Sequence, residues 1–196
     1  MRPADRVLAA LAEHQVLLVQ DVTVPSVVGL LTGESLRTSW WSHPRGQVIF
    51  AVLSQLADHP DVLFAKLLGR KVTLIHRKLW PAILAVGLAR EPWQMRGLSP
   101  DARRLLGRLD QDEEPVRGAG APVKELEARL LATAREVHTE SGRHEKVLES
   151  WRAWSARVDC GPAVSVSRAH KTLEAATAKL GASIRSLPWR RRGAAG

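Results

Sequence analysis

The chain contains a single cysteine, Cys160, among its 196 residues. One thiol excludes a disulfide within the chain, and without cysteine neighbours it also excludes the usual structural zinc spacings. Proteins of this kind are typical of a reducing compartment. We therefore expect a cytoplasmic location and no bound metal.

Long hydrophobic runs are missing as well. The longest apolar stretch, from Leu79 to Leu88, is too short to span a bilayer. Near the N-terminus, Glu13, His14 and Gln15 interrupt the apolar residues before they form the hydrophobic region of a secretory signal. The sequence also lacks a glycine-rich, phosphate-cradling motif. We expect a soluble protein that is not exported, has no membrane partner, needs no cofactor and does not hydrolyse nucleotides.

Acidic residues are outnumbered, because 29 Lys and Arg stand against 20 Asp and Glu, which gives a formal charge of +9. A cationic surface attracts nucleic acids, anionic membranes and acidic proteins. The excess of basic residues is divided between two parts of the chain, since residues 1–109 and 118–196 each hold 14 basic and 8 acidic residues. The segment 110–117 between them holds 4 acidic residues and 1 basic residue.

This acidic segment belongs to the stretch DQDEEPVRGAGAP, which combines charge with glycine and proline and interrupts the apolar periodicity. The pattern predicts an exposed linker at 110–122. It would join a first domain at 1–109 to a second, helical domain at 123–187. The Gly/Ala-rich end at 188–196 cannot pack, and it predicts a basic disordered tail.

Apolar residues recur at helical spacing throughout the first domain. They predict one helix over 4–19, a second from Pro25 to Gly33, and a third that begins near Ser42 and extends to Leu56. Further helices are expected at 79–86 and from Pro100 onwards.

Between the third helix and the helix at 79–86, residues 62–80 predict a β-hairpin with Gly69 in its turn. This segment has no acid and five cations: Lys66, Arg70, Lys71, Arg77 and Lys78. Cations on a stiff ribbon displace condensed counterions from a duplex, so we expect the hairpin to form an exposed, phosphate-binding projection.

Three helices followed by a basic hairpin resemble the winged-helix type of DNA-binding protein. This resemblance implies a mainly α fold with short β-hairpins, built from tandem winged-helix-like modules. It also makes the third helix the one that enters the groove, where Arg45 and Gln47 could contact phosphates and base edges.

The residues before that helix interleave aromatic and cationic side chains, namely Arg37, Trp40, Trp41 and His43. Indoles beside cations can stack on nucleic-acid bases. The same two tryptophans could instead be core residues that fix the entry of the helix. Both interpretations stay open on the sequence alone.

The second domain is expected to begin with a helix over 124–137. Beyond it lie the only candidates for metal or acid–base chemistry: Glu136, His138, Glu140 and His144. Their spacing matches no standard metal or catalytic motif. In the structural alternative, Ser141 and Gly142 begin a second helix whose buried face comprises Val147, Leu148, Trp151 and Trp154.

Residues 164–181 resemble the recognition helix of bacterial helix-turn-helix and winged-helix regulators. The resemblance places Arg168, His170 and Lys171 at the groove. In the tail, Arg190, Arg191 and Arg192 follow Trp189. They would either follow a phosphate backbone without sequence preference or keep a disordered end soluble.

The leading hypothesis is therefore a DNA-binding protein, active in regulation, repair or chromosome organisation, with no catalytic activity required. RNA is a further possible partner, and the protein could be a homodimer. A nucleic-acid-processing enzyme, such as a DNA repair glycosylase or nuclease, is the first alternative. A protein-interaction adaptor is the second, because a fold does not determine a function.

Overall fold

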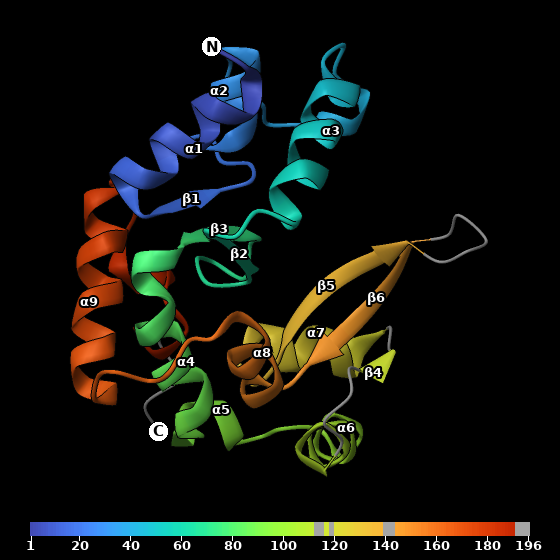
Figure 1. Cartoon of the computed structure of the whole chain (residues 1–196), viewed down its shortest axis with the longest axis vertical. Helices are drawn as coiled ribbons and strands as arrows, with labels where there is room; N and C mark the ends of the chain where they lie inside the picture. Colours follow the sequence, from blue (N-terminus) through green and yellow to red (C-terminus); the bar gives the residue numbers. More distant parts are fainter. Residues whose placement is uncertain (112–115, 118–119, 139–143, 191–196) are drawn as a thin grey trace.

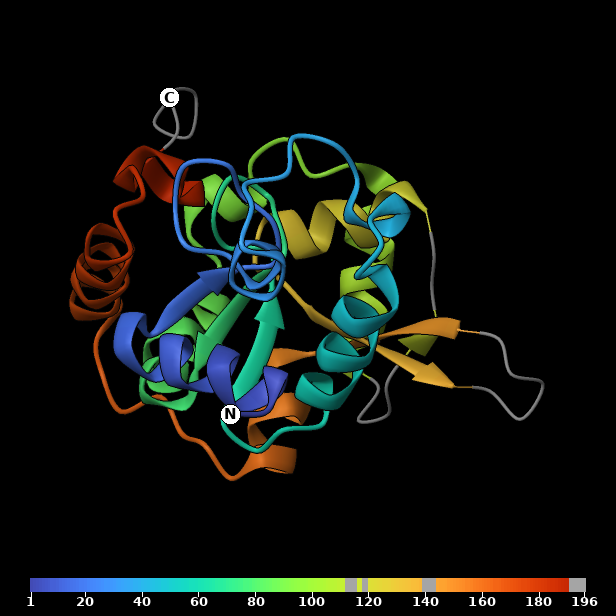
Figure 2. The same ribbon diagram turned by 90° about the horizontal axis from the view of Figure 1, so that it is seen from above.

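The computed structural model describes residues 1–111, 116–117, 120–138 and 144–190. These residues form a helix-rich fold with two small antiparallel sheets, each of three strands. The expectation of a mainly α fold with short β-hairpins is thereby confirmed. Figures 1 and 2 show one sheet beside the N-terminal helices and the other extending away from them.

The first unit, residues 1–89, alternates helices and strands around one sheet. Its elements are α1 (Pro3–His14), β1 (Val16–Leu18), α2 (Val27–Thr32), α3 (Gly46–Ala57), β2 (Val62–Ala65), β3 (Thr73–His76) and α4 (Trp80–Ala89). The strand order is β1-β3-β2, so β3 is central and both of its neighbours run antiparallel to it. Consequently Leu74 of β3 lies opposite Leu17 on one side and Phe64 on the other.

β1 replaces the last part of the helix expected over 4–19. α1 ends earlier because Gln15 adopts a left-handed conformation with φ 67°, and its N–H donates to the Leu11 carbonyl at 2.7 Å. All three residues of β1 are buried. A strand buried on both faces shows no alternation of apolar and polar residues, so its pattern resembles the continuation of a helix.

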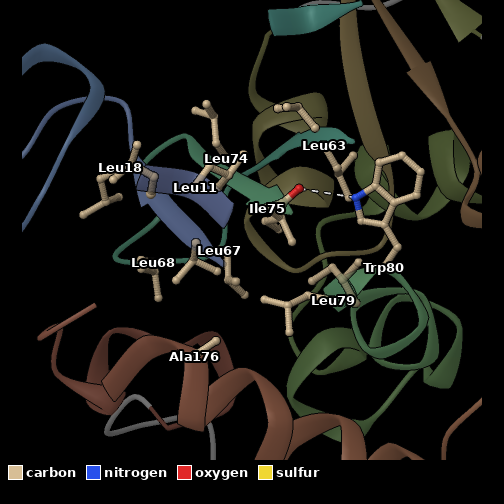
Figure 3. Close-up of a cluster of buried hydrophobic side chains, with 14 of the residues drawn as sticks. Leu11, Leu18, Leu63, Leu67, Leu68, Leu74, Ile75, Leu79, Trp80 and Ala176 are labelled. Carbon is tan, nitrogen blue, oxygen red and sulfur yellow. Dashed lines mark hydrogen bonds between the residues drawn. The ribbon is translucent and has the colours of Figure 1, made fainter. Parts of the chain in front are cut away.

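The other helices of the first unit confirm their expected positions. Ser26 caps α2 by accepting a hydrogen bond from the Gly29 N–H, and Gly33 ends it with φ 83°. α4 is buried almost all round, from Trp80 to Gly87. Figure 3 shows Trp80 donating its indole N–H to the Ile75 carbonyl, at 3.3 Å, beside the leucines of the core.

The second unit, residues 98–149, surrounds the other sheet. Its elements are α6 (Pro100–Gln111), β4 (Val116–Arg117), α7 (Ala121–Ala128), β5 (Thr133–His138) and β6 (His144–Glu149). The order β4-β6-β5 again places the last strand in the centre. The hairpin of β5 and β6 extends from the body of the molecule in both views.

The helix expected over 124–137 is wrong in its second half. α7 ends at Ala128, Leu130 adopts φ 52°, and the chain then enters β5. The helix expected to begin at Ser141 and Gly142 is wrong as well, because residues 144–149 form β6. Strand pairing decides here, since β5 and β6 pair along their whole length from 133–149 to 138–144.

The boundary between the units differs from the expected linker at 110–122. α6 extends to Gln111, β4 pairs with β6, and Val116 is only 8% exposed. The described part of the segment therefore belongs to a packed unit. Its core joins apolar residues of α6, α7 and β6, including Leu106, Leu126 and Leu148.

The C-terminal helices return to the first unit. α8 (Trp151–Val158) and α9 (Val166–Lys179) contribute Trp151, Trp154 and Leu173 to the same core as α1 and α4. α9 lies along α4 (Figure 1), and the short α5 (Pro92–Met95) connects the two units. A division of the chain at 1–109 and 123–187 therefore separates residues that pack together.

Within the described ranges, none of the helices combines the length and the apolar character that a membrane-spanning segment requires.

Candidate nucleic-acid interface

The hairpin of β2 and β3 does not project into solvent, and this expectation is wrong. Its connecting loop turns back on the protein, where Leu67 is 0% and Leu68 2% exposed. Figure 3 shows both leucines between the sheet and Ala176 of α9. The Gly69 N–H also donates to the Ser186 carbonyl at 2.9 Å. Apolar residues at the tip therefore hold the ribbon under the C-terminal segment.

The five cations of the hairpin segment do not form one surface either. Lys66 points away from solvent, and its Nζ lies 2.9 Å from a carboxylate oxygen of Glu127 in α7. Arg77 and Lys78 lie in the 3-10 turn Arg77–Leu79, at the far end of β3, and Arg77 is 3.9 Å from Asp61. Only Arg70 and Lys71 remain exposed at the tip.

Lys71 itself is paired, because its Nζ donates to Asp21 at 2.7 Å. Partial burial alone would raise the pKa of Asp21, but the hydrogen bonds from Lys71 and from the N–H and hydroxyl of Thr23 lower it from 3.8 to about 2. The folded protein therefore stabilises the charged form of Asp21 relative to its neutral form. This pair fixes the hairpin tip to the loop between β1 and α2.

The lowered pKa makes stability depend on pH in a defined direction. A carboxyl whose pKa falls on folding stabilises the native state above its ordinary pKa, and this contribution disappears as the pH falls from about 4 to about 2. Allowing for the solvent exposure of Lys71, we expect Asp21→Asn to lower the free energy of unfolding by about 1 kcal/mol at neutral pH. Urea unfolding of both proteins at about pH 7, about pH 4 and about pH 2.5 should show the difference shrinking as the pH falls. An equal difference at all three would contradict the assignment.

α3 presents an uncovered face. Its buried side comprises Ile49, Val52 and Leu56, as the spacing predicted. The opposite side exposes Gln47, Val48, Ala51 and Gln55, and no acidic residue occurs between Gly46 and Ala57. Arg45 precedes the first turn and donates from its guanidinium to the Leu31 carbonyl. This bond orients an exposed cation at the start of the helix.

Arg6 adds a second cation at this position, which the sequence gave no reason to select. It comes from α1, and with Arg45 and Val48 it lines a shallow cavity of about 310 Å³. The two arginines line the same cavity because α1 packs against α3. Helical spacing within either element alone could not predict this pair.

The tryptophans before α3 divide between the two interpretations. Trp40 is half-buried against the core, whereas Trp41 is 65% exposed and stacks on it with ring centroids 4.1 Å apart. Both lie in the 3-10 turn Trp40–Ser42. His43 is half-buried, accepts a hydrogen bond from the Arg45 N–H and lies 3.9 Å from Glu34. It therefore shapes the turn, and Trp41 is the exposed aromatic.

Hydrogen bonds connect three loops and the C-terminal segment at one end of the sheet, here called the loop edge (residues 20–24, 33–39, 67–72 and 183–187). The Gln20 amide donates to the carbonyls of Leu36 and Thr38 at 3.0 and 2.7 Å. Lys71 and Gly69 extend the connections to Asp21 and Ser186. Three exposed arginines lie on this edge, and none forms an ion pair with a described residue: Arg37, Arg70 and Arg185.

The three candidate nucleic-acid-binding residues on α9 differ in their exposure to solvent. His170 is half-buried, with its Nε2 2.9 Å from Glu91, and it stacks on Trp189 with ring centroids 4.4 Å apart. His170 is therefore turned toward the protein, and the expectation that it lies at the groove is wrong. Arg168 and Lys171 are exposed on the outer side of the helix. Ser165 caps the helix by accepting a hydrogen bond from the Arg168 N–H.

At the end of the described chain, residues 188–190 form a 3-10 turn, and Pro188 is buried. Arg190 donates two hydrogen bonds to Glu174, at 2.7 and 3.0 Å. These bonds lower the pKa of Glu174. Arg191 and Arg192 lie outside the described residues, so the expected tail begins no earlier than 191.

Three of the four candidate chemical residues, Glu136, His138 and His144, lie on β5 and β6. The backbones of His138 and His144 are direct partners across the two strands, and Glu136 lies opposite Lys146. The side chains at these positions and the whole of Glu140 lie outside the described part. Among the described residues, no group of three or more His, Cys, Asp or Glu side chains is placed to hold a metal ion. The four apolar residues expected to be buried near this segment, Val147, Leu148, Trp151 and Trp154, are all buried.

Comparisons of the chain with protein-family models, with curated proteins and with solved structures found no match in any of the three.

Proposed function

We propose that the chain is a DNA-binding protein whose first unit is a winged-helix domain and whose α3 enters the major groove of a duplex. The order of elements supports this assignment: helix, strand, helix, helix, strand and strand, with sheet order β1-β3-β2. The second unit has a related arrangement, in which α6, β4, α7, β5 and β6 form a sheet of order β4-β6-β5. This likeness supports a tandem arrangement of two such modules.

One observation carries the proposal, namely the uncovered, acid-free face of α3 with cations at its start. Gln47 and Gln55 can each present an amide to base edges, while Ala51 between them leaves room for close approach. Arg6 and Arg45 lie at the N-terminal end of the helix, where phosphates are also attracted by its dipole. The interface is therefore α3 and the loop edge, and not a projecting wing.

The lone cysteine favours a cytoplasmic location for this activity. Single-stranded DNA and RNA are tested alongside duplexes, because the exposed face of Trp41 could stack on an unpaired base. Strand cleavage or base loss during these titrations would favour the nucleic-acid-processing enzyme. Failure to bind any nucleic acid at low salt would favour the protein-interaction adaptor.

We expect the affinity for a duplex to fall with salt, with a slope of log affinity against log salt of roughly −3 to −4. This estimate assumes about four phosphates neutralised, by Arg6, Arg37, Arg45 and Arg70, at about 0.9 per phosphate. The variant Arg37→Ala/Arg70→Ala should flatten the slope by about 1.8. Fluorescence anisotropy of a labelled duplex, titrated at several salt concentrations, measures both slopes.

Arg104→Ala is the matched control, because Arg104 is an exposed cation that forms an ion pair with Asp101 in α6. Its slope should equal that of the unmodified protein. An unchanged slope in the Arg37/Arg70 variant would remove the loop edge from the interface. If no duplex binds at low salt, the proposed function itself is wrong.

A further inference from the structure

α9 has two faces of opposite character. Its inward face is buried in the core of the first unit and consists of Ala169, Leu173, Ala176 and Thr177. The outward face carries exposed residues at spacings of three and four from Arg168 to Ala178, followed by the adjacent Lys179: Arg168, Lys171, Ala175, Ala178 and Lys179. In a helix these positions form a single stripe. We call them the α9 cation stripe.

The charge of the α9 cation stripe is not neutralised within the described protein. Arg168, Lys171 and Lys179 form no ion pair with a described residue. The only acid in the helix is Glu174, which is half-buried and accepts hydrogen bonds from Arg190 and from the Trp189 indole. Cations without local counterions bind mobile ions, and the release of these ions favours binding of a polyanion.

The dimensions and side chains of the stripe fit a nucleic-acid backbone. From residue 168 to residue 179 the helix rises about 16 Å, which is about half of the roughly 34 Å turn of a duplex. Ala175 and Ala178 separate the cations with short side chains, so the helix backbone can approach the phosphates closely. An anionic membrane fits less well, because a membrane-surface helix inserts large apolar residues, and those of α9 face inward.

The α9 cation stripe lies on the opposite side of the molecule from α3. Figures 1 and 2 place α9 at one border and α3 beyond the N-terminal sheet in both views. A straight duplex along α3 therefore lies across the sheet from α9, and only residues 183–187 of the loop edge, which follow the helix, contact its C-terminal end. We propose that the α9 cation stripe binds the phosphate backbone of a second duplex, so that one protein molecule bridges two duplexes. This inference rests on the proposed function of α3.

Co-capture of two duplexes tests the bridge. The full chain is mixed with a biotinylated duplex on beads and a fluorescent duplex of unrelated sequence, and the captured fluorescence is measured. We expect capture that depends on the protein and that falls about ten-fold in Arg168→Ala/Lys171→Ala/Lys179→Ala. Arg103→Ala/Arg108→Ala/Lys124→Ala removes the same charge from exposed positions in α6 and α7, and it should retain capture.

The outcomes separate the two proposals. Binding of a single duplex without co-capture overturns the bridge and leaves the proposed function intact, whereas failure to bind any duplex overturns both. Co-capture that persists in the α9 variant would assign bridging to another surface, including one formed by a second copy of the chain. Equal losses of captured fluorescence in the α9 variant and its charge-matched control would show that net charge alone determines capture. This result would overturn the proposal that the α9 cation stripe binds the second duplex. Thermal unfolding of both variants should match that of the unmodified protein.

Discussion

Replacement of Gly87 by alanine should lower the free energy of unfolding by about 3 kcal/mol, at the upper end of the usual cost of overfilling a core. A Cβ atom at this position would lie 2.5 Å from the indole nitrogen of Trp151. The indole is held in place, because it is 2% exposed and donates its N–H to the Leu130 carbonyl at 2.7 Å. Trp154 also packs edge-on against it, with ring centroids 5.5 Å apart.

The effect should appear in thermal unfolding as a fall of roughly 6 to 12 °C, from about 2 to 4 °C per kcal/mol in a chain of this size. Gly107→Ala is the matched control, since Gly107 also lies within a helix but has no atom within 4 Å of an added Cβ. There alanine should stabilise the protein by about 0.5 to 1 kcal/mol through helix propensity alone. If the two variants unfold alike, the close contact of α4 with α8 does not exist as described.

Gly87 illustrates which features a single sequence can predict. Helices with one exposed face were found at nearly the right positions, because apolar residues at a period of 3.6 are visible locally. α3, α6 and α9 are of this kind, and their inward residues Ile49, Leu106 and Leu173 are buried. Nothing near Gly87 in the sequence indicates that Trp151, 64 positions later, occupies the space above it.

The strands were harder to predict for two physical reasons. β1 is buried on both faces and so has no alternating pattern, and residues 133–138 carry apolar positions that fit a helix as well as a strand. β6 pairs with β5 across a hairpin and also with β4, where Val116 lies opposite Leu148, 32 positions later in the chain. Such pairing overrides local preference and is not encoded in any short window.

The charged residues of the hairpin were misassigned for a related reason. The segment does carry many cations, but the role of each cation depends on whether an acidic partner from another part of the chain lies beside it. Asp21 is 50 positions from Lys71, and Glu127 is 61 positions from Lys66. A basic segment becomes a binding surface only where its cations lack such partners, as Arg70 does among the described residues.

Lys66→Met should lower the free energy of unfolding by about 2 kcal/mol. The Lys66 and Glu127 side chains are 18% and 10% exposed, so the pair is largely removed from water. Loss of the ammonium group removes the Lys66 cation from a largely buried carboxylate, which costs about 3 to 5 kcal/mol for a fully buried pair and less here because some solvent reaches both groups. Urea unfolding at neutral pH measures the change.

A double-mutant cycle separates the pair from the packing around it. Glu127→Met alone should also destabilise the protein, because it leaves the Lys66 ammonium inside. Lys66→Met/Glu127→Met should unfold within about 1 kcal/mol of the unmodified chain, since replacing both charges with apolar groups of similar volume is close to neutral. Additive losses would show that the two residues do not interact.

Because Lys66 points toward α7 and not toward solvent, the salt dependence of duplex binding should stay the same in Lys66→Met, and a flatter slope would return this lysine to the nucleic-acid interface.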